Sequence, residues 1–217
     1  ALGFARALRR AGVDQPVARA AERGGRTLML NRPLVLALAT ALFMVGSLVS
    51  VDMVIIAWAR DLGRPALAGV LAAVWGVGSV LGGLVAGGFA AQARFTRRML
   101  LLALGLAPLV VVLPPVMDPS SVWLIALVLG VGGVTIAPAI SAGNQRISGL
   151  APDDRKTEAF GWMATFTTAG SASALPVAGM LLDNFGPAAA AAGSTGVALL
   201  AAVLASRVRE RKETSVG

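Results

Sequence analysis

Six long apolar stretches constrain the fold of this 217-residue chain more than any other feature of its sequence. A helix needs about 20 mostly apolar residues to cross the roughly 30 Å hydrocarbon layer of a bilayer. The stretches have about that length, and turn-forming segments such as DPSS (118–121) and NFGP (184–187) separate them. We therefore predict an all-α membrane protein with six transmembrane helices, at Leu34–Ala59, Pro65–Ala91, Met99–Val116, Val122–Ser141, Ala159–Leu182 and Ala188–Ala205.

The composition agrees with a membrane environment and excludes several kinds of chemistry. Hydrophobic residues make up 56% of the chain and charged residues only 14%, whereas a soluble domain usually carries about 25% charged residues. The sequence has no cysteine and no histidine, which removes thiol nucleophiles and the commonest metal and acid–base ligands. It also lacks a Walker-type phosphate loop. We expect neither an enzyme nor a bound metal or cofactor.

The distribution of basic residues predicts how the helices are oriented. Seventeen of the 19 Lys and Arg residues lie in tails and connections on one side of the predicted bundle, and only Arg60 and Arg64 lie on the other. Basic residues concentrate on the cytoplasmic side of membrane proteins, so we expect both termini to be cytoplasmic. The net charge of +8 then reflects topology, and we expect no nucleic-acid partner. The excess of Arg over Lys, with abundant Ala and Gly, is typical of a GC-rich bacterial genome, and we expect the chain to lie in a bacterial plasma membrane.

The chain is predicted to divide into three regions. Residues 1–32 form either a basic cytoplasmic linker or a surface helix held by anionic lipid, residues 33–206 form the helical bundle, and residues 207–217 form a cytoplasmic tail. Small residues in the second span predict close helix packing. They form the pairs Gly78/Gly82 and Gly83/Gly87 and a stripe of Ala72, Gly76, Ser79, Gly83, Ala86 and Ala90.

Two segments carry a family resemblance. VDMVIIAWARDLGRPALAGVLAAVWGVGSVLGG (51–83) and APAISAGNQRISGLAPDDRKTEAFGWMATFTTAG (137–170) are similar to segments of actinobacterial, efflux-like members of the major facilitator superfamily. The six spans and the basic connections also resemble the C-terminal half of such a transporter, helices seven to twelve. The loop GGFAAQARFTRR (87–98) departs from the family pattern because it lacks an Asp, and simple positive-inside anchoring explains its three arginines.

The resemblance implies a secondary active transporter that works by alternating access. Each half of such a transporter is a 3+3 inverted repeat of helices, and the substrate site lies near the bilayer midplane between the halves. The first, second, fourth and fifth helices of each half line the cavity, while the third and sixth face lipid. The implied partners are a small-molecule substrate, protons, membrane lipid and the N-terminal six-helix half of the same transporter.

Asp52 is the one charged residue between Leu34 and Ala59. Acidic residues inside transmembrane segments are costly, and they commonly carry protons in pumps and transporters. Asp52 lies past the middle of its span, about 9 Å toward the outside at about 1.5 Å per residue. We predict that Asp52 is the proton-coupling residue. The alternative is a carboxylate at the outer mouth that is hydrated or paired with an arginine.

Polar residues at the cytoplasmic ends of the fourth and fifth spans form a second group of candidates. Arg146 and Glu158 could form a gate pair that breaks as the cavity opens inward. The alternative is ordinary helix-end chemistry, because acids suit the positive end of a helix and bases the negative end. The candidate residues for the substrate cavity are Trp75, Asn144, Gln145, Trp162 and Thr165.

Tryptophan has two expected roles in this chain. Trp75 and Trp162 could stack on an apolar or cationic substrate, or they could only fill space. Trp58 and Trp123 lie at span ends, where they would act as interfacial anchors. An apolar cavity with few acids favours efflux of small lipophilic or cationic molecules. The alternatives are the permease subunit of an ATP-driven transporter and a membrane scaffold subunit that does not transport.

Overall fold

The computed structural model describes residues 28–88 and 94–208, and within these ranges the chain is helical and contains no β-strand. The predicted class, an all-α membrane bundle, is confirmed. Most of the predicted linker and tail, and the last residues of the predicted second span, lie outside the described residues. In chain order the helices are α3 (Arg32–Asp61), α4 (Ala66–Gly88), α5 (Phe95–Leu106), α6 (Pro108–Val112), α7 (Val122–Gly133), α8 (Ile136–Leu150), the 3₁₀ helix η1 (Asp153–Arg155), α9 (Lys156–Phe185) and α10 (Pro187–Arg207).

Five helical segments of the described chain are long and apolar enough to cross a membrane. They are α3, α4, α5 with α6, α7 with α8, and α10. The predicted fifth span is present as α9, which has 30 residues and is therefore about 45 Å long. α9 is long enough to cross a membrane but is not among the five apolar segments. It carries several Ser and Thr residues and a charged first turn that includes Glu158.

Two of the predicted spans are interrupted. The third span divides at Ala107, directly before Pro108, into α5 and α6. The fourth span divides at Val134 and Thr135 into α7 and α8. It also extends to Leu150, beyond the predicted end at Ser141, because the polar residues that follow Ser141 continue the helix. The connection between the fourth and fifth spans is therefore shorter than the predicted bounds, Ser141 and Ala159, implied.

Glycine and proline set the sharp reversals between neighbouring helices. Gly63 follows α3 with a φ of 66°, and Gly186 separates α9 from α10 with a φ of 83°. Residues with a side chain rarely adopt such angles, which glycine reaches readily. Pro187 begins α10, where its lack of an amide hydrogen costs no helical hydrogen bond. Both reversals therefore lie where the sequence supplies the residues they need.

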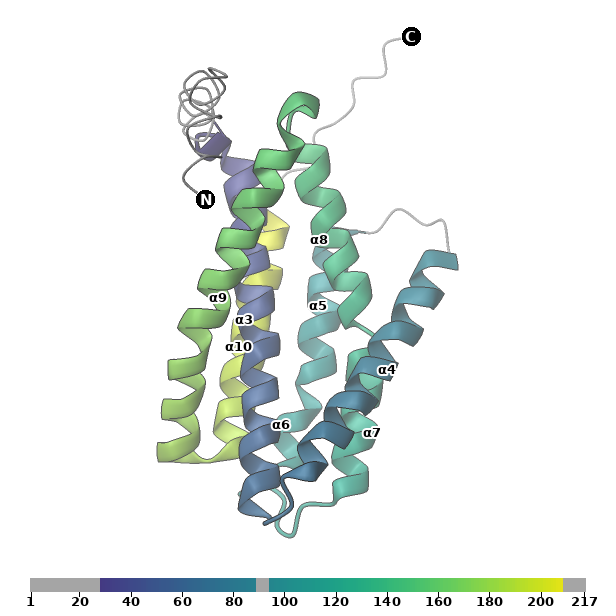
Figure 1. Cartoon of the computed structure of the whole chain (residues 1–217), viewed down its shortest axis with the longest axis vertical. Helices are drawn as coiled ribbons and strands as arrows, with labels where there is room; N and C mark the ends of the chain where they lie inside the picture. Colours follow the sequence, from purple (N-terminus) through teal and green to yellow (C-terminus); the bar gives the residue numbers. More distant parts are fainter. Residues whose placement is uncertain (1–27, 89–93, 209–217) are drawn as a thin grey trace, which may run out of the picture.

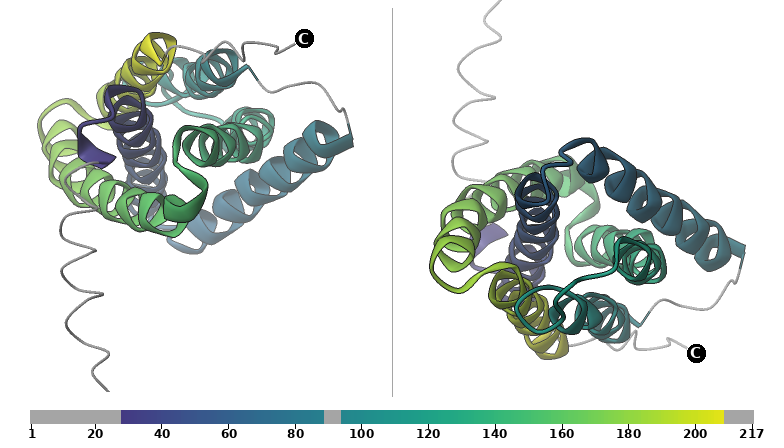
Figure 2. Two further views of the ribbon diagram at one scale, coloured as in Figure 1. Left: turned by 90° about the horizontal axis from the view of Figure 1, so that it is seen from above. Right: turned by 90° about the horizontal axis from the view of Figure 1, so that it is seen from below.

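α3 is the most buried of the five candidate spans and α4 the least. α3 packs along α9 and α10, whereas α4 diverges from α3 after the reversal that joins them (Figure 1; Figure 2). Two apolar clusters fill the bundle. The first includes Leu34, Met99 and Ile147, and the second includes Trp58 and Leu109. The exposed sides of α4 and α9 are consequently free of contacts with the rest of the described chain.

The two ends of the bundle differ in charge. We define the basic end as the end where α3, α5 and α9 begin and α8 and α10 finish, at the top of Figure 1. The opposite end carries Arg60 and Arg64 together with the acids Asp61, Asp118 and Asp183. The described basic residues of the basic end are Arg32, Arg94, Arg97, Arg98, Arg146, Arg155, Lys156 and Arg207.

Candidate functional site

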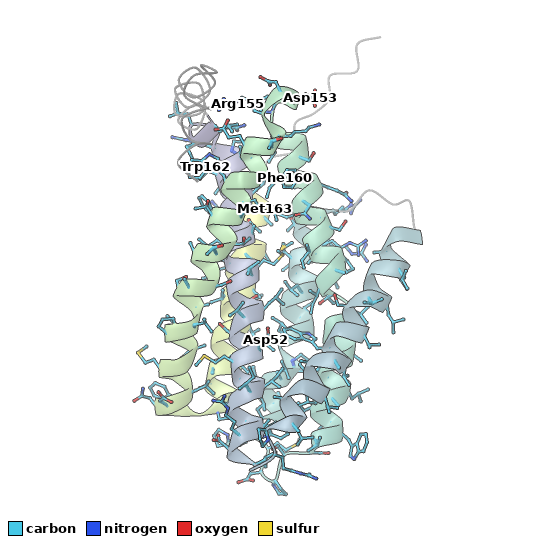
Figure 3. The ribbon with its side chains drawn as sticks, in the orientation of Figure 1. Asp52, Asp153, Arg155, Phe160, Trp162 and Met163 are labelled. Atoms are coloured by element: carbon cyan, nitrogen blue, oxygen red, sulfur yellow. The ribbon has the colours of Figure 1, made fainter. Side chains whose placement is uncertain are left out.

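Asp52 lies on α3, in the half of the helix nearer the opposite end (Figure 3). Its side chain is exposed, and so is that of Ile56 one turn further along the same face. Within residues 28–88 and 94–208, no group forms a hydrogen bond or an ion pair with the Asp52 carboxylate. The suggested pairing with an arginine is therefore not formed within this described part of the chain. The carboxylate stays available to a proton, a ligand or another protein segment.

The predicted gate residues at the basic end are not joined to each other. Glu158 Oε2 accepts two hydrogen bonds from Arg155, from Nη2 at 2.8 Å and from Nε at 3.0 Å. The Arg146 guanidinium instead donates to the carbonyl of Val208 at the end of α10, over 3.2 Å. The Arg155–Glu158 pair spans three positions of one segment. This arrangement favours the helix-end interpretation of Glu158.

A second ion pair in the same segment strengthens this interpretation. Lys156 Nζ lies 2.7 Å from Asp153 Oδ1, again at a spacing of three residues. The hydrogen bond from Lys156 is the main reason that the pKa of Asp153 lies below its ordinary range, and the attraction between the two charges adds to it. Acids in the first turn of a helix are stabilised by the helix dipole. Glu158 in the first turn of α9 therefore stabilises the beginning of that helix.

The polar candidates for the cavity have different surroundings. Asn144 is half-buried, and its Oδ1 has no hydrogen-bond partner in the described part of the chain. Gln145 is exposed and donates from Nε2 to Ser141 Oγ over 3.2 Å. Thr165 is exposed on α9, and its hydroxyl donates to the carbonyl of Gly161 over 3.2 Å. Asn144 is thus the polar candidate whose buried acceptor atom has no partner among the described residues.

The two tryptophans that were predicted for the cavity are packed against protein. Trp75 is only 7% exposed and belongs to the apolar cluster that includes Trp58. Its ring and its backbone carbonyl both lie against Gly133 of α7, and its Nε1 has no partner among the described residues. Trp162 is half-buried on the first apolar cluster, near Arg155 at the basic end (Figure 3). Trp75 is therefore a core residue in this structure, whereas contact of Trp162 with substrate stays a prediction.

The anchoring role predicted for Trp58 is wrong. Trp58 is 2% exposed, and its Nε1 donates a hydrogen bond of 3.0 Å to Ser120 Oγ in the segment before α7. It is a core residue that ties this segment to the end of α3. Trp123, by contrast, is 85% exposed, so its role as an interfacial anchor stays a prediction. Their positions near span ends did not distinguish the two residues.

Close packing of α4 depends on one of the two glycine pairs. A Cβ at Gly78 would overlap the carbonyl of Gly130, and one at Gly82 would overlap the carbonyl of Val134. In the other pair and the stripe, Gly83 also packs on α8, because a Cβ there would lie 3.2 Å from the Cβ of Ala137. Gly76 and Gly87 are exposed and would meet no atom within 4 Å.

The exposed side of α9 is rich in small and hydroxyl-bearing residues. Ser173 donates to the carbonyls of Ala169 and Gly170 over 2.8 and 3.2 Å, and Thr165 also bonds to its own helix. These internal bonds satisfy the hydroxyl groups without water. Small residues allow another helix to approach closely. This surface therefore suits contact with protein or a partly polar cavity better than contact with lipid alone.

Comparison with known proteins identifies the family. A sequence model of the Major Facilitator Superfamily matches residues 31–216, which includes every helix described above. The comparison with curated proteins gave no match. The match extends over both the span that carries Asp52 and the segment that carries Arg155 and Glu158.

Proposed function

This chain belongs to the Major Facilitator Superfamily of membrane transporters, and we propose that it forms the C-terminal half of a proton-coupled exporter of small lipophilic or cationic molecules. As a multi-pass membrane protein of this family, it is expected to bind a small-molecule substrate. The observation that carries the coupling proposal is the exposed carboxylate of Asp52, which lies within a transmembrane span and has no partner in the described chain. An acid inside a transmembrane span that can exchange a proton is what coupling to a proton gradient requires.

The unpartnered surfaces of α4 and α9 support the need for a second half. The described part of α4 is mostly exposed, with large apolar side chains such as Val77 and Leu84. α9 presents the small and hydroxyl-bearing surface described above. Six helices form only one wall of a cavity that lies between two bundles. The proposed partner is the N-terminal six-helix half of the same transporter.

The proposed cargo follows from the chemistry of the exposed surfaces. Asp52 is the one acid away from the ends of the described spans that could attract a cation, and its neighbours on α3 are apolar. Such a surface favours amphiphilic cations over sugars, which need several hydrogen-bonding side chains. We assign Asn144, Gln145 and Thr165 to the edge of this path because they add polar groups toward the basic end.

The decisive experiment compares Asp52→Asn with Asp61→Asn in the intact transporter, reconstituted in proteoliposomes with an imposed proton gradient. Asp61 is an exposed acid at the end of the same helix, so it is a matched control. We expect Asp52→Asn to abolish gradient-driven movement of a lipophilic fluorescent cation and Asp61→Asn to retain it. Full gradient-driven flux in Asp52→Asn would remove this carboxylate from the coupling mechanism.

Orientation and location have a separate test. We propose a bacterial plasma membrane with both termini in the cytoplasm, because the basic end carries most of the described Arg and Lys residues. Reporter tags inserted at residues 62 and 119, at the opposite end, should then be exposed outside the cell. Cytosolic labelling at both positions would show that the orientation is the opposite of the one proposed.

A further inference from the structure

α5 and α10 lie side by side at one edge of the bundle (Figure 2). They run in opposite directions, so that α5 begins and α10 finishes at the basic end. The first apolar cluster contains Phe95 and Met99 from the start of α5 together with Ala205 and Val208 from the end of α10. Charged residues at these two helix ends therefore lie at the same level of the bundle.

Four arginines lie at these two helix ends, and we call them the arginine patch: Arg94, Arg97 and Arg98 at the start of α5 and Arg207 at the end of α10. Arg98 is half-buried and the other three are exposed. Within residues 28–88 and 94–208, none of the four side chains forms a hydrogen bond or an ion pair. The patch therefore keeps its charged donors free for a ligand.

No acidic residue of the described chain pairs with the arginine patch. α5 and α10 contain neither Asp nor Glu. The described acids of the basic end are Asp153, Asp154 and Glu158, in η1 and α9, where Asp153 pairs with Lys156 and Glu158 with Arg155. The positive-inside rule places basic residues on this side of the membrane, but it does not require them to lack a counter-charge. A cluster of one sign of charge attracts ligands of the opposite sign, so the patch favours an anion.

Exposed aliphatic side chains continue both helices away from the arginine patch. On α5, spacings of three and four residues place Leu101 and Leu104 on the same face as Arg97. On α10, Val203 lies one turn before Arg207. All three aliphatic residues are exposed. At about 1.5 Å per residue, Leu104 lies about 10 Å from Arg97 along the helix axis, which is deep enough to meet lipid hydrocarbon.

We propose that the outer side of α5 and α10 binds an anionic phospholipid, with its phosphate in the arginine patch and its acyl chains on the aliphatic side chains beside it. Arginine forms strong, charge-assisted hydrogen bonds with phosphate, and basic pockets between transmembrane helices on the cytoplasmic side bind anionic headgroups. A phosphate ion from water would engage the arginines alone, whereas a phospholipid also covers the aliphatic faces. The site does not depend on the transport function proposed above.

Lipid titration of the intact transporter, purified and delipidated in an uncharged detergent, tests the headgroup preference. A ligand that binds only the folded state raises the thermal transition temperature. We compare phosphatidylglycerol, which is anionic, with phosphatidylcholine of the same acyl chains, which carries no net charge. Phosphatidylglycerol should raise the transition temperature of the unaltered protein at a lower concentration than phosphatidylcholine. Equal responses to the two lipids would overturn the proposal.

Two double variants that remove the same charge locate the site. In Arg97→Gln/Arg207→Gln, the phosphatidylglycerol concentration that gives half of the shift should rise about fivefold for each arginine removed. The response of this variant to phosphatidylcholine should stay unchanged, which shows that it still folds. Arg60→Gln/Arg64→Gln removes two exposed arginines at the opposite end and should leave both responses unchanged. If the two double variants lose the preference alike, it reflects net charge and the assigned site is wrong.

Two further measurements distinguish a lipid from a free anion. Inorganic phosphate at the same concentrations should not shift the transition temperature, and a shift as large as that from phosphatidylglycerol would show a site for phosphate ions. Phosphatidylglycerol with a photoreactive acyl chain, in nanodiscs of phosphatidylcholine, should label residues 100–104 of α5 and 199–203 of α10. This labelling should fall in Arg97→Gln/Arg207→Gln and persist in Arg60→Gln/Arg64→Gln. Equal labelling in the two variants would leave only ordinary contact with bulk lipid and overturn the proposal.

Discussion

Gly170 of α9 lies so close to the carbonyl oxygen of Leu42 in α3 that a Cβ at position 170 would overlap this carbonyl. On the other side of the same contact, a Cβ at Gly46 would lie 3.2 Å from the carbonyl of Gly170 and 3.4 Å from the Cβ of Ala174. Lipid supplies no hydrophobic force between helices, so close backbone packing is a main source of their attraction. The contact between α3 and α9 therefore depends on the missing side chain at position 170.

Gly170→Ala should destabilise the protein, because α3 and α9 must separate to admit the methyl group. Overpacking of this kind usually costs about 1–3 kcal/mol. Thermal unfolding of the detergent-solubilised transporter measures the effect as a lower transition temperature. Gly161→Ala is the control on the same helix, since Gly161 is exposed and its Cβ would meet no atom within 4 Å.

Replacing an exposed helical glycine by alanine usually stabilises a helix by about 0.5–1 kcal/mol. The two variants should therefore shift the transition temperature in opposite directions. Equal shifts would contradict the tight contact at position 170.

Ser120→Ala should also lower stability, by about 1–3 kcal/mol, because it leaves the buried Nε1 of Trp58 without its acceptor. Ser121→Ala is the matched control, since the neighbouring Ser121 is exposed and its side chain does not cap α7. Thermal unfolding again measures the difference. A loss in Ser121→Ala as large as that in Ser120→Ala would show that the bond from Trp58 contributes nothing.

The sequence predicted the spans well because the length and composition of an apolar stretch are set by the membrane itself. It did not predict where the fourth span breaks. Proline can bend a helix, but the break lies before Pro138, at Val134 and Thr135, where the Val134 carbonyl finds space against Gly82 of another helix. A contact between residues so far apart in the chain leaves no local pattern to read.

The candidate site was predictable to a smaller extent. Asp52 was identified from the sequence because a single charge in an apolar span is conspicuous, and the structure adds that it is exposed. The pair of Arg146 with Glu158 required two helix ends to meet, whereas Arg155 reaches Glu158 within its own segment. An ion pair between residues three positions apart needs no tertiary contact, so the pairing of Arg155 with Glu158 was the simpler expectation. Trp58 and Trp123 both lie near the end of a predicted span. Only their burial in the structure shows that Trp58 is a core residue and Trp123 an exposed one.

The Asp153–Lys156 pair predicts a small dependence of stability on pH. The hydrogen bond from Lys156 keeps the pKa of Asp153 below 3.8, its ordinary value. A carboxylate with a lowered pKa in the folded protein stabilises it above the unfolded-state pKa, and this contribution is lost as the pH falls through the folded-state value. Asp153→Asn should therefore lower the transition temperature slightly at about pH 7 and have no effect well below about pH 3.8.

Thermal unfolding of Asp153→Asn across this pH range measures the dependence. Asp154→Asn is its control, because Asp154 is exposed and forms no ion pair within residues 94–208. The prediction fails if Asp153→Asn costs as much stability in acid as at neutral pH.

The last prediction separates the helix-end and gate interpretations of Glu158. Arg155 and Glu158 are in contact, so a double-mutant cycle with Arg155→Gln and Glu158→Gln should give a coupling energy. Their side chains are 22% and 27% exposed, and solvent screening limits the coupling to at most about 1 kcal/mol. The cycle of Arg146→Gln with Glu158→Gln should be additive, because Arg146 donates to the end of α10 instead. Both cycles use thermal unfolding in detergent. Coupling between Arg146 and Glu158 as strong as that between Arg155 and Glu158 would restore the gate pair, which would then form in a conformation other than this one.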